Sequence, residues 1–360
     1  ILAASVGASI PVPGIVGGET GLVENRYYGT PIMDRATLDP PVSVMHQPTP
    51  SDPPLMSADR VAERVRRHVA EQRGLSLVRI GDGEGVVLSR LNRPEPILDS
   101  YLTTHFGTQV DTSRLDDLAI RLQAALAGAD VIGIRPDVRA PRFPADLDDM
   151  PPQALLEWAR EHLALRPEER SRLDVESAVR LVTLGRWMRH FAWPETALLT
   201  SAWIHFDWLE SGFLADLALG QERIGLVTGR PELASRFRSL GIAVDHWPVP
   251  LRFLRRDPGW TPHFPDRFDE LVDTLEPAFP GQLFLVGAGI CGKVYCDVIA
   301  RRGGIALDIG AVCDAWLGIS TRPRVARFRW GQDEVPERLL LGNQLHAARR
   351  AQEAASHDPG

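Results

Sequence analysis

The stretch LSLVRIGDGEG (residues 75–85) gives the first indication of how this chain of 360 residues folds. Residues 75–80 form a short apolar run, which predicts a buried β-strand, and the run leads directly into Gly81-Asp-Gly-Glu-Gly85. Ligands of open parallel sheets collect beyond the carboxyl ends of the strands. Two carboxylates on a glycine-flanked turn at such a position therefore indicate a functional site.

Apolar runs and helical patterns alternate along the rest of the chain. A helix is predicted to begin after the N-cap Ser57 and to end at Gly74. Further strands are predicted at 130–134, 197–199, 223–228, 242–247, 282–286 and 304–309. Helical stretches of about 10 to 15 residues separate most of these strands, which predicts an α/β fold with a mainly parallel sheet.

The amino-acid composition argues against some partners and cellular locations. The chain has 40 basic and 47 acidic residues, a formal net charge of −7, so nucleic acid is not an expected partner. The three cysteines form no CxxC pair, which favours a reducing compartment, and we predict a cytoplasmic location. The apolar residues 1–18 are interrupted by prolines and glycines and lack a basic start. We therefore expect neither a signal peptide nor a transmembrane segment.

Three parts are predicted along the chain. Residues 1–56 are rich in proline and show no sustained periodicity, so we expect an extended or disordered arm. Residues 57–345 form the folded domain. Residues 346–360 are expected to be a flexible tail.

The acidic motif Asp82-Gly83-Glu84 is the first site candidate. The flanking glycines allow unusual backbone dihedrals and the close approach of a ligand, so both carboxylates can face one point. Hard oxygen ligands of this kind suit Mn²⁺ or Mg²⁺, whose coordination shell phosphate oxygens commonly complete. A polar turn whose carboxylates are merely solvated is the alternative interpretation.

The loop VGAGICGKV (residues 286–294), between a predicted strand and a predicted helix, is the second candidate. Its glycines fit the G-x-G-x-x-G pattern at Gly287, Gly289 and Gly292. Asp308 ends the next strand, as in a dinucleotide site, but too little chain follows for a complete dinucleotide fold. Backbone N–H groups at a helix N-terminus beside Lys293 predict an anion site for a phosphate or diphosphate. A tight packing turn is the alternative.

Two segments carry a resemblance to a known family. VRIGDGEG (78–85) resembles the V-R-F-G-D-G-E segment of GT-D-type glycosyltransferases. AGICGKVYCDVIARRGGIALDIG (288–310) is similar to that family's glycine-and-lysine loop, helix and following D-I-G strand. The resemblance extends over about residues 60–320. It implies a Rossmann-like, GT-D-like domain, with helices on both faces of a mainly parallel sheet.

The resemblance also implies an activity. A GT-D-type enzyme of the hexosyltransferase kind would move a sugar from a nucleoside diphosphate sugar, typically UDP-linked, to a hydroxyl acceptor in glycan or cell-envelope assembly. The acceptor hydroxyl would belong to a glycan, to a lipid-linked acceptor or to a protein-linked acceptor. The D-x-E pair, here Asp82 and Glu84, would bind Mn²⁺ or Mg²⁺, and the metal would stabilise the departing diphosphate.

Other residues complete the predicted site. His205 and Asp207 follow a predicted strand and are candidate bases for the acceptor hydroxyl, although packing in the core is the alternative for such an aromatic-rich segment. Arg79 is placed either to reach a phosphate or to pair with Asp82. The predicted donor-binding residues are Arg79, Gly81, Gly83, Gly287, Gly289, Gly292, Lys293 and Asp308.

Two other functions remain open. An NAD(P)-dependent oxidoreductase would use Gly287–Gly292 and Asp308 and would leave Asp82 and Glu84 without a role. A non-catalytic binding module on a degenerate transferase fold would still bind the nucleotide but would not catalyse sugar transfer. A larger assembly or a homo-oligomer is a further expectation.

Overall fold

The computed structural model describes residues 54–92, 95–107, 110–139, 144, 147–250, 262–321 and 335–356. Residue contacts divide the chain into residues 1–37 and residues 38–360, and all described residues belong to the second unit. Nearly all of the predicted N-terminal arm lies outside the described residues.

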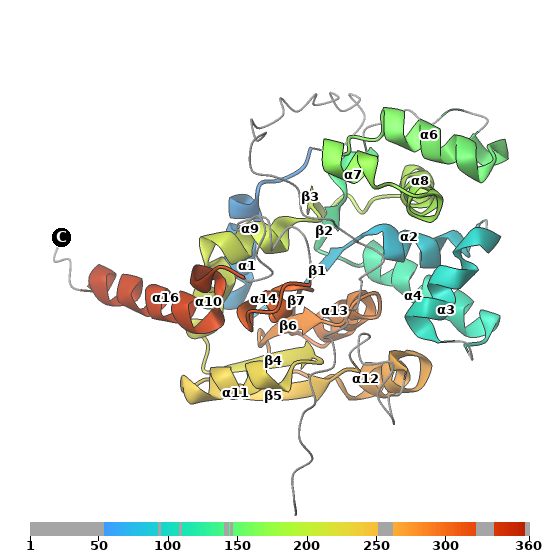
Figure 1. Cartoon of the computed structure of the whole chain (residues 1–360). Coiled ribbons are helices and arrows are strands. Elements are labelled where there is room, and N and C mark those ends of the chain that lie inside the picture. Colours follow the sequence, from blue (N-terminus) through green and yellow to red (C-terminus); the bar gives the residue numbers. More distant parts are fainter. Residues whose placement is uncertain are drawn as a thin grey trace, which may run out of the picture. The chain divides into compact units, whose positions relative to one another are not determined.

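A seven-stranded sheet with the order β3-β2-β1-β7-β6-β4-β5 forms the centre of the described part, and all its strand pairs are parallel (Figure 1). The strands are β1 (Leu75–Arg79), β2 (Val131–Ile134), β3 (Leu198–Ser201), β4 (Arg223–Thr228), β5 (Ala243–Pro248), β6 (Leu283–Gly287) and β7 (Ile305–Asp308). The predicted α/β class with a Rossmann-like parallel sheet is confirmed.

Helices connect the strands. The α-helices are α1 (Ala58–Ala70), α2 (Asp82–Ser89), α3 (Asp99–Phe106), α4 (Thr112–Ala127), α5 (Pro136–Arg139), α6 (Pro152–His162), α7 (Pro167–Ser171), α8 (Val175–His190), α9 (Ile204–Ser211), α10 (Phe213–Leu219), α11 (Pro231–Ser239), α12 (Phe268–Thr274), α13 (Gly292–Arg301), α14 (Val312–Trp316) and α16 (Leu341–Ser356). Single helical turns are η1 (Pro96–Leu98), η2 (Leu147–Asp149), η4 (His263–Arg267) and η5 (Glu337–Leu339). Within the described ranges, no helix has the length and apolar character needed to cross a membrane.

The two faces of the sheet are covered by different helices because side chains alternate along each strand. Leu75 and Leu307 are fully buried in one core together with residues of α1, α9, α10 and α11. Asp308, next to Leu307, points to the opposite face and contacts Lys293 of α13. Helix α13 contacts β1, β6, β7 and α4. Helices therefore cover both faces, as predicted.

The described chain begins against the edge of the sheet. The Met56 N–H donates to the carbonyl of Leu199 (2.7 Å), and the Thr200 hydroxyl donates to the carbonyl of Met56 (2.9 Å). Ser57 then caps α1, since its hydroxyl accepts the N–H of Arg60 (3.3 Å), as the sequence predicts. The last residue of the predicted arm is thus bound beside β3.

The last described helix extends further than the sequence suggests. Helix α16 continues to Ser356, so the predicted boundary between the domain and the tail falls inside it. Gln344 fixes its first turns, because its side-chain amide donates to the carbonyl of Leu209 (2.6 Å) and accepts the indole N–H of Trp316 (2.9 Å). After Leu345 the helix is mostly exposed.

Candidate functional site

Neighbouring strand ends bring most of the predicted site residues to one edge of the sheet. Arg79 ends β1 and Asp308 ends β7, and these two strands lie side by side. Gly287 ends β6, which is the next strand. His205 lies just after β3, on the other side of β1 and β2. The parallel sheet thus collects segments that are far apart in the sequence.

The segment Asp82-Gly83-Glu84 is the first turn of helix α2 and not an open turn. Gly81 is the N-cap, and its N–H donates to Glu84 Oε2 (2.7 Å), in the manner of a capping box. Residues two apart on a helix do not face the same side. The two carboxylates therefore diverge, and each has its own partners.

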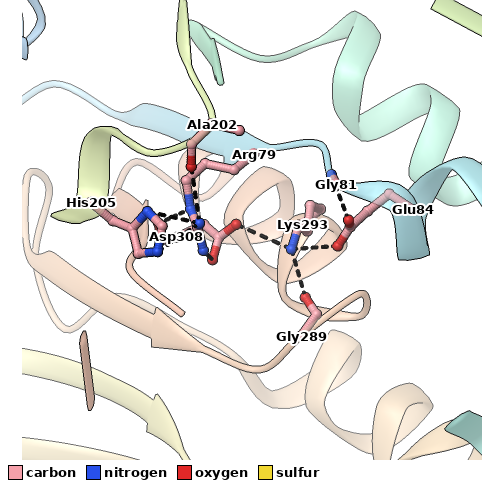
Figure 2. Close-up of polar contacts among 8 residues, drawn as sticks. All are labelled: Arg79, Gly81, Glu84, Ala202, His205, Gly289, Lys293 and Asp308. Carbon is pink, nitrogen blue, oxygen red and sulfur yellow. Dashed lines mark hydrogen bonds and ion pairs between the residues drawn. The ribbon is translucent and has the colours of Figure 1, made fainter. Parts of the chain in front are cut away.

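Glu84 joins the two predicted motifs through a buried ion pair. Its Oε1 lies 2.6 Å from Nζ of Lys293, the only lysine of the chain. The same ammonium lies 3.2 Å from Asp308 Oδ2 and donates to the carbonyl of Gly289 (3.0 Å). Figure 2 shows Lys293 between these oxygens. Glu84, Lys293 and Asp308 are all buried, so water screens their charges only weakly.

Burial and ion pairing shift the pKa values of Lys293 and Asp308 in opposite directions. Burial by itself lowers the pKa of Lys293, but the Asp308 and Glu84 carboxylates outweigh it, and the pKa lies above its ordinary value. Burial raises the pKa of Asp308, but Arg79 and Lys293 outweigh it, and the pKa lies below its ordinary value. Lys293 and Asp308 are therefore both charged at neutral pH.

Arg79 extends the network across three strand ends. Its Nη2 lies 2.9 Å from Asp308 Oδ1, and its Nε donates to the backbone carbonyl of the same residue (2.9 Å). Its Nη1 donates to the carbonyl of Ala202 (3.2 Å) and lies 2.9 Å from Nδ1 of His205 (Figure 2). Of the two roles that the sequence leaves open for Arg79, its ion pair is made with Asp308 and not with Asp82.

Asp82 lies between two arginines. Its Oδ2 is 3.1 Å from Nε of Arg180, and its Oδ1 is 3.7 Å from Nη1 of Arg135. The Arg180 guanidinium also lies over the Tyr101 ring, at 4.8 Å from its centre. Sequence reasoning missed both arginines. Arg135 directly follows β2, a position that could have revealed it, whereas Arg180 lies within α8, and no sequence signal points to it.

The glycine loop lies against the start of α2. A Cβ built on Gly83 would lie 3.4 Å from Cδ1 of Ile290 in the loop. Gly289 is exposed and has a φ of +60°, a conformation that favours glycine. In the described part of the chain, the backbone N–H groups of Gly289 and Ile290 donate to no acceptor. Together with the N–H groups of Ala288 and Cys291, which also donate to no backbone acceptor there, they leave the loop with free donors beside the N-terminus of α13.

The two predicted bases differ in exposure. His205 is buried at 3% exposure and contacts Arg79, whereas Asp207 is only partly buried. Both lie in the first turn of α9. Trp208 of the same segment belongs to the core, where its indole N–H donates to the carbonyl of Ala58 (3.1 Å). The packing interpretation therefore holds for Trp208.

The residues predicted to hold a metal do not fit a divalent cation as they are placed. Both oxygens of Glu84 have partners in Lys293 and Gly81, and both oxygens of Asp82 face arginines. Among the residues that the structure describes, no three His, Cys, Asp or Glu side chains are grouped so that they could hold a metal ion. Metal binding by Asp82 and Glu84 stays a prediction.

Comparisons with known proteins agree with the predicted family. Residues 56–170 match a family model described as a GT-D fold-like domain. The chain is 15% identical to a solved domain of unknown function 1792, described as having a distinct glycosyltransferase fold. The alignment covers 69% of this chain and 75% of that chain, with a TM-score of 0.40.

A second solved structure is similar to the same extent. It is a protein from Streptococcus sanguinis described as a new glycosyltransferase (DUF1792), with 18% identity and a TM-score of 0.40. The alignment covers 72% of this chain and 81% of that chain. No curated protein matches the sequence. The match of residues 56–170 to the family model confirms the resemblance to the GT-D family and supports a glycosyltransferase.

Proposed function

We propose that the protein is a glycosyltransferase that transfers a hexose from a nucleoside diphosphate sugar, with UDP as the expected nucleotide, to a hydroxyl acceptor. The observation that carries the proposal is the contact between the two motifs of the resemblance. Lys293 follows the glycine loop, and its ammonium lies 2.6 Å from the carboxylate of Glu84 in the D-x-E segment. The GT-D-like match over residues 56–170, which include that segment, supports the same proposal.

The glycine loop is the proposed site of the donor diphosphate. The free N–H groups of Gly289 and Ile290 and the N-terminus of α13 favour negative charge there. Because Gly289 has no side chain and is exposed, a phosphate can approach the backbone closely. Hydrogen bonds to the diphosphate strengthen as the sugar leaves and charge develops, which stabilises the transition state.

Asp207 is the proposed base for the acceptor hydroxyl. A base must be able to reach the hydroxyl whose proton it takes. His205 is buried against Arg79, while Asp207, two residues further along the same helix, is partly accessible. We assign His205 to positioning, because its contact with Arg79 links the segment after β3 to the buried ion pairs.

Metal dependence through Asp82 and Glu84 rests on the resemblance alone, and the placement of both carboxylates against cationic side chains argues against it. A metal there would neutralise the departing diphosphate. The oxidoreductase alternative loses support, because the Asp308 carboxylate is 1% exposed and bound to Arg79 and Lys293. It is therefore not available to a ribose hydroxyl.

Nucleotide binding followed by donor turnover tests the proposal. UDP at 100 times its dissociation constant should stabilise the folded protein by about 2.7 kcal/mol, which is measurable as a shift in melting temperature. NAD⁺ should give no shift. A set of UDP-hexoses is then screened for hydrolysis and for transfer, with Mn²⁺ and with EDTA. A shift with NAD⁺ alone would contradict the proposal.

A pair of glycine variants locates the nucleotide. Gly289 and Gly241 both have a positive φ, and a Cβ on either would have nothing within 4 Å. Alanine at either position should cost about 1–2 kcal/mol of stability through backbone strain. Gly289→Ala should also weaken UDP binding by about tenfold or more. Equal UDP affinity in Gly289→Ala and Gly241→Ala would place the nucleotide elsewhere.

A further inference from the structure

We infer that the Lys293 ammonium permanently occupies the cation position between Glu84 and Asp308, so that no divalent metal ion binds to these carboxylates in this chain. Lys293 is thus a positioning residue, because the positive charge of its own side chain holds the glycine loop in place. The role of that loop in donor binding rests on the proposed function, but the occupation of the cation position does not.

Three oxygens surround the Lys293 ammonium, which donates a hydrogen bond to Gly289 O and makes ion-pair contacts with Glu84 and with Asp308 Oδ2, an atom that has no hydrogen-bond partner. An ammonium has three N–H donors and no acceptor. Its three oxygen neighbours are Glu84 Oε1 (2.6 Å), Gly289 O (3.0 Å) and Asp308 Oδ2 (3.2 Å), and they come from α2, the glycine loop and β7. Carboxylate and carbonyl oxygens are also the ligands that Mg²⁺ and Mn²⁺ prefer. The ammonium therefore uses the oxygens that a metal would need.

The other oxygens of these carboxylates are also bound. Glu84 Oε2 accepts the N–H of Gly81 (2.7 Å), and Asp308 Oδ1 pairs with Arg79 Nη2 (2.9 Å). Two carboxylates thus face two cations, and the buried group is neutral overall. A divalent ion that entered beside Lys293 and Arg79 would meet like charge at short range in a weakly screened site.

Asp82 does not restore a metal site. It lies on a different side of α2 from Glu84, and its carboxylate faces Arg180 and Arg135. We therefore expect the wild-type protein to bind UDP with the same affinity, within about twofold, in EDTA and in Mg²⁺.

The single lysine makes a direct experiment available. Labelling with ¹⁵N-lysine gives one side-chain ammonium signal, that of Lys293, and a Mn²⁺ ion bound to the adjacent Glu84 would broaden it beyond detection. We expect the signal to persist when Mn²⁺ is added to the chain of 360 residues without nucleotide. Loss of the signal would overturn the inference.

Removal of the ammonium should create the metal site. Lys293→Ala frees Glu84 Oε1, Gly289 O and Asp308 Oδ2, and we expect it to bind one Mn²⁺ per chain, seen as depletion of the electron paramagnetic resonance signal of free Mn²⁺. Lys293→Ala/Glu84→Gln should lose that binding. A folded Lys293→Ala variant that depletes no more Mn²⁺ than wild type would overturn the inference, and if it does not fold, the wild-type ¹⁵N experiment decides.

These readouts separate the two proposals. Neither the ¹⁵N signal nor Mn²⁺ depletion involves UDP or a sugar, so failure to bind UDP would contradict the proposed function and leave the cation position unaffected. UDP binding that requires Mg²⁺ or Mn²⁺ in wild type would overturn the inference while supporting the transferase.

Discussion

Arg79 and Asp308 bind each other twice at the carboxyl ends of adjacent strands: side chain to side chain (Nη2 to Oδ1, 2.9 Å) and side chain to backbone carbonyl (Nε to O, 2.9 Å). The Asp308 side chain is 1% exposed. Arg79 also reaches Ala202 and His205, so this pair links β1 and β7 to the segment after β3. The geometry of the candidate site depends on it.

Asp308→Asn should strongly destabilise the protein. Asparagine keeps the shape of the side chain but removes a charge that balances Arg79 and Lys293 in a buried place. Removing one charged partner from a buried ion pair costs about 3–5 kcal/mol. Urea denaturation measures this free energy. The matched control is Asp216→Asn, whose pair with Arg66 is exposed and should change stability by about 1 kcal/mol or less.

The contribution of Asp308 should disappear in acid. Arg79 and Lys293 hold the pKa of Asp308 below its ordinary value of 3.8 despite burial. A carboxylate whose pKa is lower in the folded state stabilises that state above the unfolded pKa, and this stabilisation is lost as the pH falls through the folded value. The difference in unfolding free energy between wild type and Asp308→Asn should be constant near neutral pH and shrink below pH 3.8. An equal difference at every pH would contradict this assignment.

Gly310→Ala should displace Arg79. A Cβ at Gly310 would lie 2.4 Å from Arg79 Nη2, and the residue has a φ of +48°. Gly303 also has a positive φ, but a Cβ there would meet nothing within 4 Å, so Gly303→Ala measures the strain of the backbone alone. We expect Gly310→Ala to lose about 1–3 kcal/mol more than Gly303→Ala in thermal or urea unfolding. Equal losses would mean that Arg79 adjusts freely.

His263 should make stability depend on pH in the mildly acidic range. Burial, with a smaller effect of Arg267, lowers its pKa from 6.5 to about 4. Between these values the unfolded chain binds a proton that the folded chain does not, so stability falls as the pH decreases from 6.5 to 4. His263→Gln should reduce this slope of melting temperature against pH. His263 Nε2 lies 2.7 Å from the Tyr295 hydroxyl. The side-chain amide of the glutamine variant keeps a polar partner for that hydroxyl.

Substitution of Gln344 should destabilise the protein more than deletion of the residues that follow Leu345. Gln344→Leu leaves the buried indole N–H of Trp316 without its partner, at a cost of about 1–3 kcal/mol, while the carbonyl of Leu209 keeps the N–H of Gly212. Deletion of residues 346–360 removes mostly exposed positions of α16 and should cost about 1 kcal/mol or less. Differential scanning calorimetry compares the two. A large loss on deletion would show that the end of the chain contributes to the folded domain.

The order of helices and strands could be predicted well from the sequence because each depends on local periodicity. The strands predicted at 130–134 and 282–286 agree with β2 and β6 within one residue. In the aromatic segment after β3, Gly212, with a φ of +75°, separates the helices α9 and α10. The start of α2 at Asp82 has half of a capping-box signal in the sequence, since Glu84 at position N3 accepts the N–H of Gly81, which has no side chain to cap the helix in return.

Local sequence patterns establish that two charged, glycine-rich segments follow apolar strands, and such segments gather at the carboxyl edge of a parallel sheet. Which of their charges meet depends on how the chain packs in three dimensions. Glu84 binds Lys293 and Asp82 faces Arg180 because β1 lies beside β7 and α8 lies against α2. Strand order and helix packing depend on contacts between residues distant in the chain, and a local pattern does not contain them. The partners of a buried charge are therefore a property of the folded protein.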